Sequence, residues 1–202
     1  MSQISAILLT AGESTRMGKP KALLDWFGKP LIQWQIDTLI DAGVDEVIVV
    51  LGHLHDLISL SITGNKVSTV VNNNYKQGKT SSIKTGLNMV SEEANHILLI
   101  SVDQPRPKWL ISLVIDKHLQ NKPLVTAPRF EDHGGHPVIY SISLKSNLEN
   151  ISEANLGVRQ IMSRYTNEIQ WVTVDSPLAT LDLNTPKVYY EAKRMFTKLL
   201  NT

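Results

Sequence analysis

The stretch ISAILLTAGESTRMGKPKALL, residues 4–24, decides the fold that this sequence predicts. It opens with an apolar run at residues 4–9, typical of a buried β-strand, and continues into the small-residue turn TAGES at residues 10–14. Such a turn presents several backbone N–H groups at one place, and these dipoles attract anions. Cations that neutralise further negative charge follow within nine residues of Gly12, namely Arg16, Lys19 and Lys21. The segment therefore predicts a polyphosphate-binding loop.

The spacing of this loop excludes two common phosphate-binding motifs. A Walker A loop has four residues between its glycines and then Lys-Ser/Thr, whereas five residues separate Gly12 from Gly18 and Pro20 takes the hydroxyl position. The dinucleotide fingerprint G-x-G-x-x-G is also absent, because Glu13 and Ser14 follow Gly12. A basic surface loop after an edge strand is the alternative, but the order of strand, turn and cations favours phosphate binding.

Composition narrows the class of protein further. A chain of 202 residues with 42% hydrophobic and 19% charged residues suits one globular domain, which we expect to span residues 1–202. The net charge of +1 gives no reason to expect a nucleic-acid partner, and the lack of cysteine excludes disulfides and thiolate metal sites. The first residues lack a signal-peptide pattern, and no apolar run approaches the roughly 18 residues of a membrane helix. We therefore expect a cytoplasmic protein without membrane contact.

Strand and helix patterns alternate over the first two thirds of the chain. Uninterrupted Val/Ile/Leu runs indicate strands buried on both faces, as in a parallel sheet. They lie at residues 4–9, 47–51, 67–71, 97–101 and 124–127, with helical patterns at 30–42, 81–90 and 107–119. The last third predicts strands at 136–142 and 169–174 and helices at 157–165 and 186–199. This rhythm predicts an α/β fold with helices on both faces of a mostly parallel sheet and a small antiparallel edge.

Ligands of such sheets collect beyond the carboxyl ends of the strands. The segment that follows the fourth apolar run there is Val102-Asp103-Gln104-Pro105, which carries the carboxylate of Asp103. Mg²⁺ prefers one or two carboxylates together with phosphate oxygens and water, so Asp103 beside a phosphate loop predicts a magnesium ligand. An N-cap before the next helix is the alternative role for this residue.

Six blocks in this order resemble the molybdenum-cofactor nucleotidyltransferases, and the sequence is most similar to the cytidylyltransferase branch. The blocks are LTAGESTRMGKPKALL (9–24), GKPLIQWQIDTLIDAGVDEVIVVLG (28–52), QGKTSSIKTGL (77–87), DQP (103–105), GGHPV (134–138) and LDLNTP (181–186). The resemblance implies a three-layer Rossmann-like nucleotidyltransferase fold. It also implies Mg²⁺-dependent transfer of CMP from CTP to molybdopterin, with release of pyrophosphate and an apo-molybdoenzyme as a further partner. In-line transfer of this kind needs positioning and cations rather than a covalent intermediate.

The resemblance also assigns roles to residues of this sequence. Arg16 would hold the β- and γ-phosphates, Lys21 would lie near the α-phosphate, and Asp103 would bind Mg²⁺. The nucleotide-binding set is Thr10, Ala11, Gly12, Glu13, Ser14, Arg16, Lys21, Gly78, Ser81 and Ser82, although the two serines also suit helix capping. Acceptor binding falls to Gln104, His136, Arg159 and Asn184, and a second metal carboxylate to Asp182.

Several positions leave alternatives open. Ala11 before Gly12, and the blocks DQP and GGHPV, favour CTP, whereas Asn184 is intermediate between the cytidylyl and guanylyl branches. Val102 stands where the cytidylyl branch has glycine. GTP-dependent transfer to molybdopterin, transfer to a sugar phosphate or another small phosphate, and a non-catalytic nucleotide or cofactor carrier are the competing hypotheses.

Overall fold

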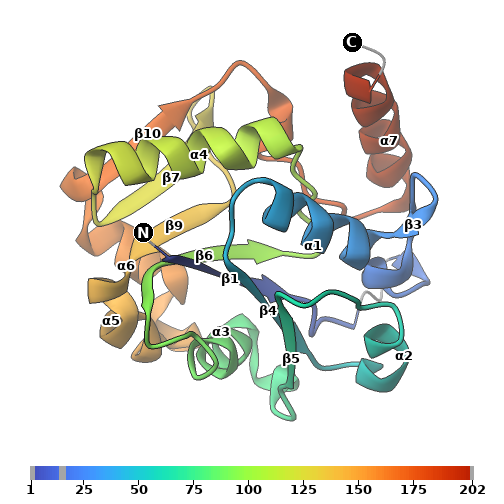
Figure 1. Cartoon of the computed structure of the whole chain (residues 1–202), viewed down its shortest axis with the longest axis horizontal. Helices are drawn as coiled ribbons and strands as arrows, with labels where there is room; N and C mark the ends of the chain where they lie inside the picture. Colours follow the sequence, from blue (N-terminus) through green and yellow to red (C-terminus); the bar gives the residue numbers. More distant parts are fainter. Residues whose placement is uncertain (1–2, 14–16, 201–202) are drawn as a thin grey trace.

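A twisted, mostly parallel β-sheet forms the centre of the computed structural model, which describes residues 3–13 and 17–200 (Figure 1). The main path across the eight-stranded sheet is β10-β7-β9-β6-β1-β4-β5, and β8 pairs with β7 off this path. The α/β class and the mostly parallel sheet expected from the apolar runs are confirmed. The strands are β1 (Gln3–Leu9), β4 (Glu46–Leu51), β5 (Val67–Val71), β6 (Ala94–Ser101), β7 (Val125–Phe130), β8 (His133–Gly134), β9 (Val138–Ser141) and β10 (Ile169–Thr173).

One interior strand runs against its neighbours. β1 pairs in parallel with β4 and β6, β4 with β5, and β7 with β10. β9 pairs antiparallel with β6 on one side and with β7 on the other, and the short β8 is antiparallel to β7. The expected antiparallel patch therefore lies inside the sheet rather than at its edge. β9 returns from β7 through a short connection, which joins antiparallel strands, and its apolar start at residues 138–140 is buried.

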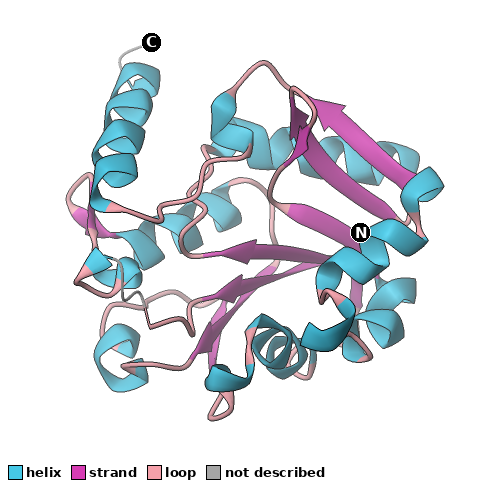
Figure 2. Cartoon of the chain, turned by 180° about the vertical axis from the view of Figure 1, so that it is seen from behind, coloured by secondary structure: helices cyan, strands magenta, loops and turns pink. Residues whose placement is uncertain are grey.

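Helices cover both faces of the sheet (Figures 1 and 2). The helices α1 and α4 pack on one face together with α7, and α3, α5 and α6 pack on the other. Their bounds are α1 (Leu31–Asp41), α2 (His55–Ser59), α3 (Lys79–Leu87), α4 (Lys108–Asn121), α5 (Lys145–Glu149), α6 (Val158–Arg164) and α7 (Pro186–Leu200). Short 3-10 turns occupy Lys21–Leu23, Tyr75–Gln77, Ile142–Leu144, Glu153–Asn155, Thr166–Glu168 and Pro177–Ala179.

The central strand β1 explains why its sequence is apolar without interruption. Ala6 and Leu8 point into the core cluster beneath α1 and α4, while Ile7 and Leu9 point into the cluster beneath α3. Successive side chains of a strand face opposite sides, so a strand with helices on both faces needs apolar residues at every position.

The segment between the loop after β1 and the helix α1 forms a small hairpin, which packs against the last helix, α7. β2 (Asp25–Trp26) and β3 (Lys29–Pro30) form a separate two-stranded sheet. The Trp26 ring is fully buried and packs against Phe196 of α7, with ring centroids 5.1 Å apart. Lys193 of α7 also places its ammonium 2.7 Å from a carboxylate oxygen of Asp25. These contacts fix the segment that leads from the loop into α1.

The parallel strands β1, β4, β5 and β6 end at one edge of the sheet, here called the carboxyl edge. Loops after these strands carry the polar residues described below.

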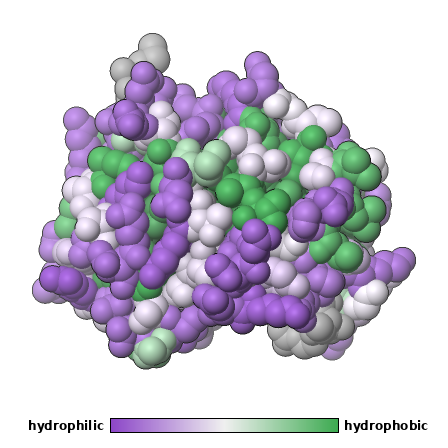
Figure 3. Space-filling view, turned by 90° about the horizontal axis from the view of Figure 1, so that it is seen from below, coloured by the Kyte–Doolittle hydropathy of each residue, from purple (hydrophilic) through white to green (hydrophobic). Residues whose placement is uncertain are grey.

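Across residues 3–13 and 17–200, no helix combines the length and apolar character required to span a bilayer. On the molecular face seen from below, hydrophobic areas alternate with hydrophilic ones (Figure 3).

Candidate functional site

Two adjoining cavities open at the carboxyl edge. The first, of about 360 Å³, lies at the ends of β1, β4 and β6. Its lining includes Thr10, Ala11, Gly12, Lys21, His53, Tyr75, Gly78, Lys79, Ser82, Asp103, Gln104 and Asp182. The second, of about 490 Å³, lies between α3, α6 and the start of β9. Its lining includes Lys79, Gln104, His136, Tyr140, Glu153, Leu156, Arg159, Met162, Trp171 and Asp182. Lys79, Gln104 and Asp182 line both cavities and are called the shared wall.

The first loop is held close to β4. The backbone N–H and the hydroxyl of Thr10 both donate to the carbonyl of Val50, at 2.9 and 2.8 Å. A Cβ on Gly52 would lie 2.7 Å from the Cβ of Ala11, so only glycine permits this approach of β4 to the loop. The Thr10 side chain therefore anchors the loop, and Gly12 is exposed, with no atom of the described residues other than its chain neighbours within 4 Å of the place of a Cβ.

Lys21 joins the loop to two other segments. Its ammonium lies 2.8 Å from a carboxylate oxygen of Asp103 and 3.1 Å from the side-chain oxygen of Asn184. The backbone N–H of Leu183 donates to the carbonyl of Asp103 at 2.7 Å, which brings the segment around Asn184 to the end of β6. Lys21, the expected metal carboxylate of Asp103 and Asn184 of the last sequence block thus meet at one place.

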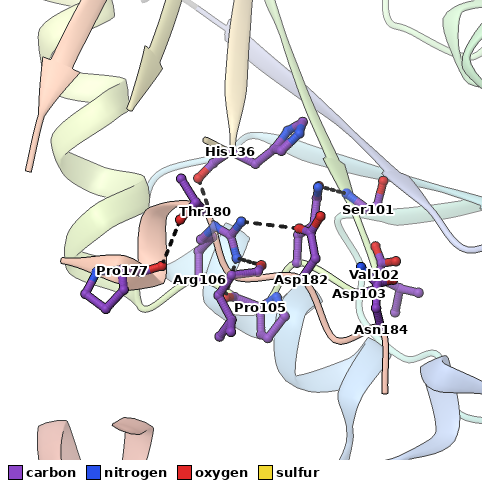
Figure 4. A network of polar contacts seen from close by, with 12 residues as sticks. Ser101, Val102, Asp103, Pro105, Arg106, His136, Pro177, Thr180, Asp182 and Asn184 are labelled. Carbon is purple, nitrogen blue, oxygen red and sulfur yellow. Dashed lines mark hydrogen bonds and ion pairs between the residues drawn. The ribbon is translucent and has the colours of Figure 1, made fainter. Parts of the chain in front are cut away.

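Arg106 lies beside the second carboxylate, that of Asp182 (Figure 4). It is 1% exposed, and it donates to the carbonyls of Pro105, His136 and Leu181 at 3.0, 3.0 and 2.6 Å. Its remaining nitrogen lies 3.9 Å from a carboxylate oxygen of Asp182. Burial lowers the pKa of the guanidinium to about 10, which leaves it charged at neutral pH.

The same surroundings change the pKa of the Asp182 carboxyl. Burial raises the pKa of its carboxyl, and a hydrogen bond from Gln104 opposes that rise. The Gln104 side chain in turn accepts from the backbone N–H of Ser101 at 3.1 Å. Asp103 and Asp182 both line the first cavity. One or two carboxylates beside a phosphate loop match the ligands that Mg²⁺ uses with phosphate oxygens. Within residues 3–13 and 17–200 there is no group of three or more potential metal-binding side chains.

The two expected serines, Ser81 and Ser82, lie in the first turn of α3 and differ in what their side chains contact. Asn72 donates to the hydroxyls of both Ser81 and Ser82 at 2.9 Å. Ser81 donates to the carbonyl of Gly78 at 2.9 Å and is not part of either cavity lining, whereas Ser82 lines the first cavity. Glu153 caps this helix, because its carboxylate accepts from the backbone N–H of Thr80 at 2.7 Å. Gly78 has φ +108°, and a Cβ there would overlap the Glu153 side chain.

The sequence block GGHPV forms one side of the second cavity. A Cβ on Gly134 would lie 2.9 Å from the Trp171 ring, and one on Gly135 would overlap the backbone of Ala179. His136 is kept neutral because burial lowers the pKa of its imidazole to about 3. Its Nδ1 has no hydrogen-bond partner in the part of the chain that the structure describes. Arg159 also reaches this cavity.

The structure thus gathers most of the expected site residues at one edge. Arg16 and Ser14 lie outside the described residues, and Glu13 is exposed and lines neither cavity. Reasoning from the sequence missed Lys79, Arg106, Glu153 and Trp171. The position of Lys79 within the QGKTSS block was the available signal for the first of these.

Residues 6–180 match the family of MobA-like NTP transferase domains. The chain therefore belongs to this family. It is 34% identical over 103 residues to nicotine blue oxidoreductase from Paenarthrobacter nicotinovorans, an alignment covering 50% of each protein. It is 25% identical over 206 residues to molybdenum cofactor cytidylyltransferase from Escherichia coli strain K12, covering 98% of this chain and 100% of that protein. The chain thus spans about half the length of the first relative and all of the second.

Solved structures share the fold. Rv0371c from Mycobacterium tuberculosis H37Rv has a TM-score of 0.83 at 24% identity, covering 96% of this chain and 98% of that chain. A complex of Rv0371c with manganese has a TM-score of 0.77 at 23% identity, covering 96% and 99%.

Proposed function

We propose that this protein transfers CMP from CTP to a molybdopterin-type acceptor and releases pyrophosphate. The observation that carries the proposal is the shared wall, since Lys79, Gln104 and Asp182 line both cavities. A transferase that joins two substrates needs two sites that meet where the new bond forms. Similarity to molybdenum cofactor cytidylyltransferase supports the choice of nucleotide and acceptor.

CTP would occupy the first cavity. The loop around Gly12 lines this cavity and suits phosphate oxygens, and Lys21 supplies a positive charge beside Asp103. We assign Arg16 to the β- and γ-phosphates by its place in the sequence block, as it lies outside the described residues. Ala11 and Ser82 line the same cavity and are the proposed contacts of the base.

The acceptor would occupy the second cavity, with His136 and Arg159 in its lining. An oxygen of its phosphate attacks the α-phosphorus of CTP, and the bond from that phosphorus to the β-phosphate oxygen breaks. The electron pair leaves with pyrophosphate, so an ionised acceptor phosphate needs no general base. The Trp171 ring, which holds the Arg129 guanidinium 4.3 Å from its centroid, adds an aromatic surface that suits a flat heterocycle.

We assign Mg²⁺ to Asp103 and Asp182. A bound Mg²⁺ ion would neutralise charge on the phosphate oxygens. The two carboxylates fit such an ion because they line the same cavity as the phosphate loop. A complex of Rv0371c with manganese supports a divalent cation in this fold. We also propose that the whole chain forms one domain and that the reaction takes place in the cytoplasm. An apo-molybdoenzyme would then receive the product.

Pyrophosphate release tests the function directly. The protein with Mg²⁺ should release pyrophosphate fastest from CTP and only when molybdopterin is present. CTP, GTP and ATP should each be combined with molybdopterin, a sugar phosphate and no acceptor. Faster release from GTP would replace the cytidylyl assignment with guanylyl transfer, and release with a sugar phosphate would replace the acceptor. Tight binding of CTP or molybdopterin without any turnover would contradict transfer and identify a carrier.

A further inference from the structure

Lys79 occupies a distinctive position between the two cavities. It is the first residue of α3 and, of the described Lys and Arg residues, the only one that lines both. Burial lowers the pKa of its ammonium, and the carboxylates of Asp103, Asp182 and Glu153 oppose that shift. The side chain nevertheless keeps contact with solvent, so an incoming ligand can reach it.

The charges around the shared wall show why a cation is needed there. Asp182 is the other charged member of that wall, and Asp103 lies beside it in the first cavity. An acceptor phosphate that approaches a nucleotide α-phosphate brings two anions together next to these carboxylates. Repulsion between like charges is strong at short range where solvent is partly excluded. Lys21 lines the first cavity only, where it is bonded to Asp103 and Asn184.

We propose that Lys79 binds the acceptor's phosphate and the nucleotide's α-phosphate at the same time, and so holds the attacking oxygen against the phosphorus. This role rests on the proposed function, since it needs one phosphorylated substrate in each cavity. Lys79 neutralises the repulsion between the two groups and takes no part in proton transfer. Its contribution is therefore expected in the approach of the acceptor and in the transfer step.

Kinetics of charge variants test this role. Lys79→Met should lower kcat/KM for the acceptor about a hundredfold, as expected for loss of a charged contact to a reacting phosphate. Lys79→Arg, which keeps the charge, should recover a large part of that loss. Lys84→Met is the matched control, because Lys84 lies on the same helix and lines neither cavity. Equal effects of Lys79→Met and Lys84→Met would overturn the inference.

Chemical labelling supplies a test that does not depend on turnover. Acetic anhydride should modify Lys79 in the free wild-type protein, with the extent measured by mass spectrometry. CTP with Mg²⁺ should protect Lys79, molybdopterin alone should also protect it, and Lys84 should stay unprotected with both. Protection by only one of the two ligands would assign Lys79 to one cavity and contradict a bridging role.

The two tests separate this inference from the proposed function. If the wild-type protein shows no transfer but both ligands protect Lys79, the proposed activity fails while the bridging position stands. If transfer proceeds and Lys79→Met retains full kcat/KM, the activity stands and the role of Lys79 is refuted.

Discussion

The ammonium of Lys21 lies 2.8 Å from a carboxylate oxygen of Asp103, across 82 positions of sequence. Because the same ammonium also reaches Asn184 at 3.1 Å, it joins the first loop, the end of β6 and the segment before α7. The pair is partly exposed, with side-chain exposures of 12% and 27%, so it contributes about 1 kcal/mol or less to folding. Its main effect is to hold a cation and a carboxylate together in the first cavity.

Asp103→Ala should abolish turnover and leave the fold intact. The substitution removes the proposed metal ligand, a change expected to lower kcat at least about a hundredfold. The backbone carbonyl of residue 103, which accepts from Leu183, remains in place. Pyrophosphate release measures the loss, and circular dichroism checks the fold. Asp116→Ala, at an exposed position on α4, is the control. Near-normal activity of Asp103→Ala would remove this residue from the metal site.

Arg106→Met should destabilise the protein by about 2–4 kcal/mol, because three backbone carbonyls lose a charged donor in a buried place. Urea unfolding measures the change in the free energy of unfolding. Arg164→Met replaces an exposed arginine and should change that free energy by less than about 0.5 kcal/mol. A similar, small effect of both substitutions would show that Arg106 does not hold the segments around His136 and Leu181.

Gly135→Ala should also destabilise the fold, by about 2 kcal/mol or more, because the added Cβ overlaps the Ala179 backbone and cannot move away by rotation. The midpoint of urea unfolding is the measurement. Gly12→Ala is the control for stability, since among the described residues only its chain neighbours come within 4 Å of its Cβ position. An unchanged midpoint for Gly135→Ala would mean that the turn before β9 adapts freely.

A buried histidine pair should make stability fall in acid. His118 is fully buried, with Nδ1 2.8 Å from the Thr126 hydroxyl and Nε2 2.9 Å from Nδ1 of His96. Burial, together with His96, lowers the pKa of His118 from 6.5 to about 4. Between pH 6.5 and about pH 4, the unfolded chain therefore binds a proton at His118 that the folded protein does not bind. The contribution to stability is complete above pH 6.5 and is lost towards pH 4, by at most about 3 kcal/mol.

His118→Gln should reduce this pH dependence. The free energy of unfolding, measured in urea at pH 7 and pH 5, should change less between the two pH values than in the wild-type protein. His133→Gln, at an exposed position, should leave the difference unchanged. A wild-type protein equally stable at both pH values would show that the pair titrates normally.

The parallel part of the fold was predictable because its signal is local. Apolar runs such as residues 47–51 and 67–71 mark strands of the sheet, and the structure has β4 and β5 there. The β2–β3 hairpin was missed, since strands of two residues are too short to show any periodicity. An antiparallel patch was expected in the last third of the chain, but the place of β9 inside the sheet was not evident, because the position of a strand depends on which neighbours it meets.

Some residues of the candidate site were predictable from the sequence and others were not. Asp103 was predictable because it comes two residues after the end of a buried strand, where ligands of α/β sheets collect. Arg106 was not, because a charged residue beside a proline is normally exposed, and its acceptors lie as far as 75 positions away. Lys79 resembles any lysine in the first turn of a helix until both cavities are known.

Because β9 runs against its neighbours, it is the beginning of β9 that lies at the carboxyl edge. In a parallel strand the groups that reach the carboxyl edge come after the last apolar residue. In β9 they come before the first one, and His136 precedes Val138 for this reason. A survey of chains with this topology should therefore examine the residues upstream of the strand corresponding to β9, where substitutions that alter acceptor choice would accumulate.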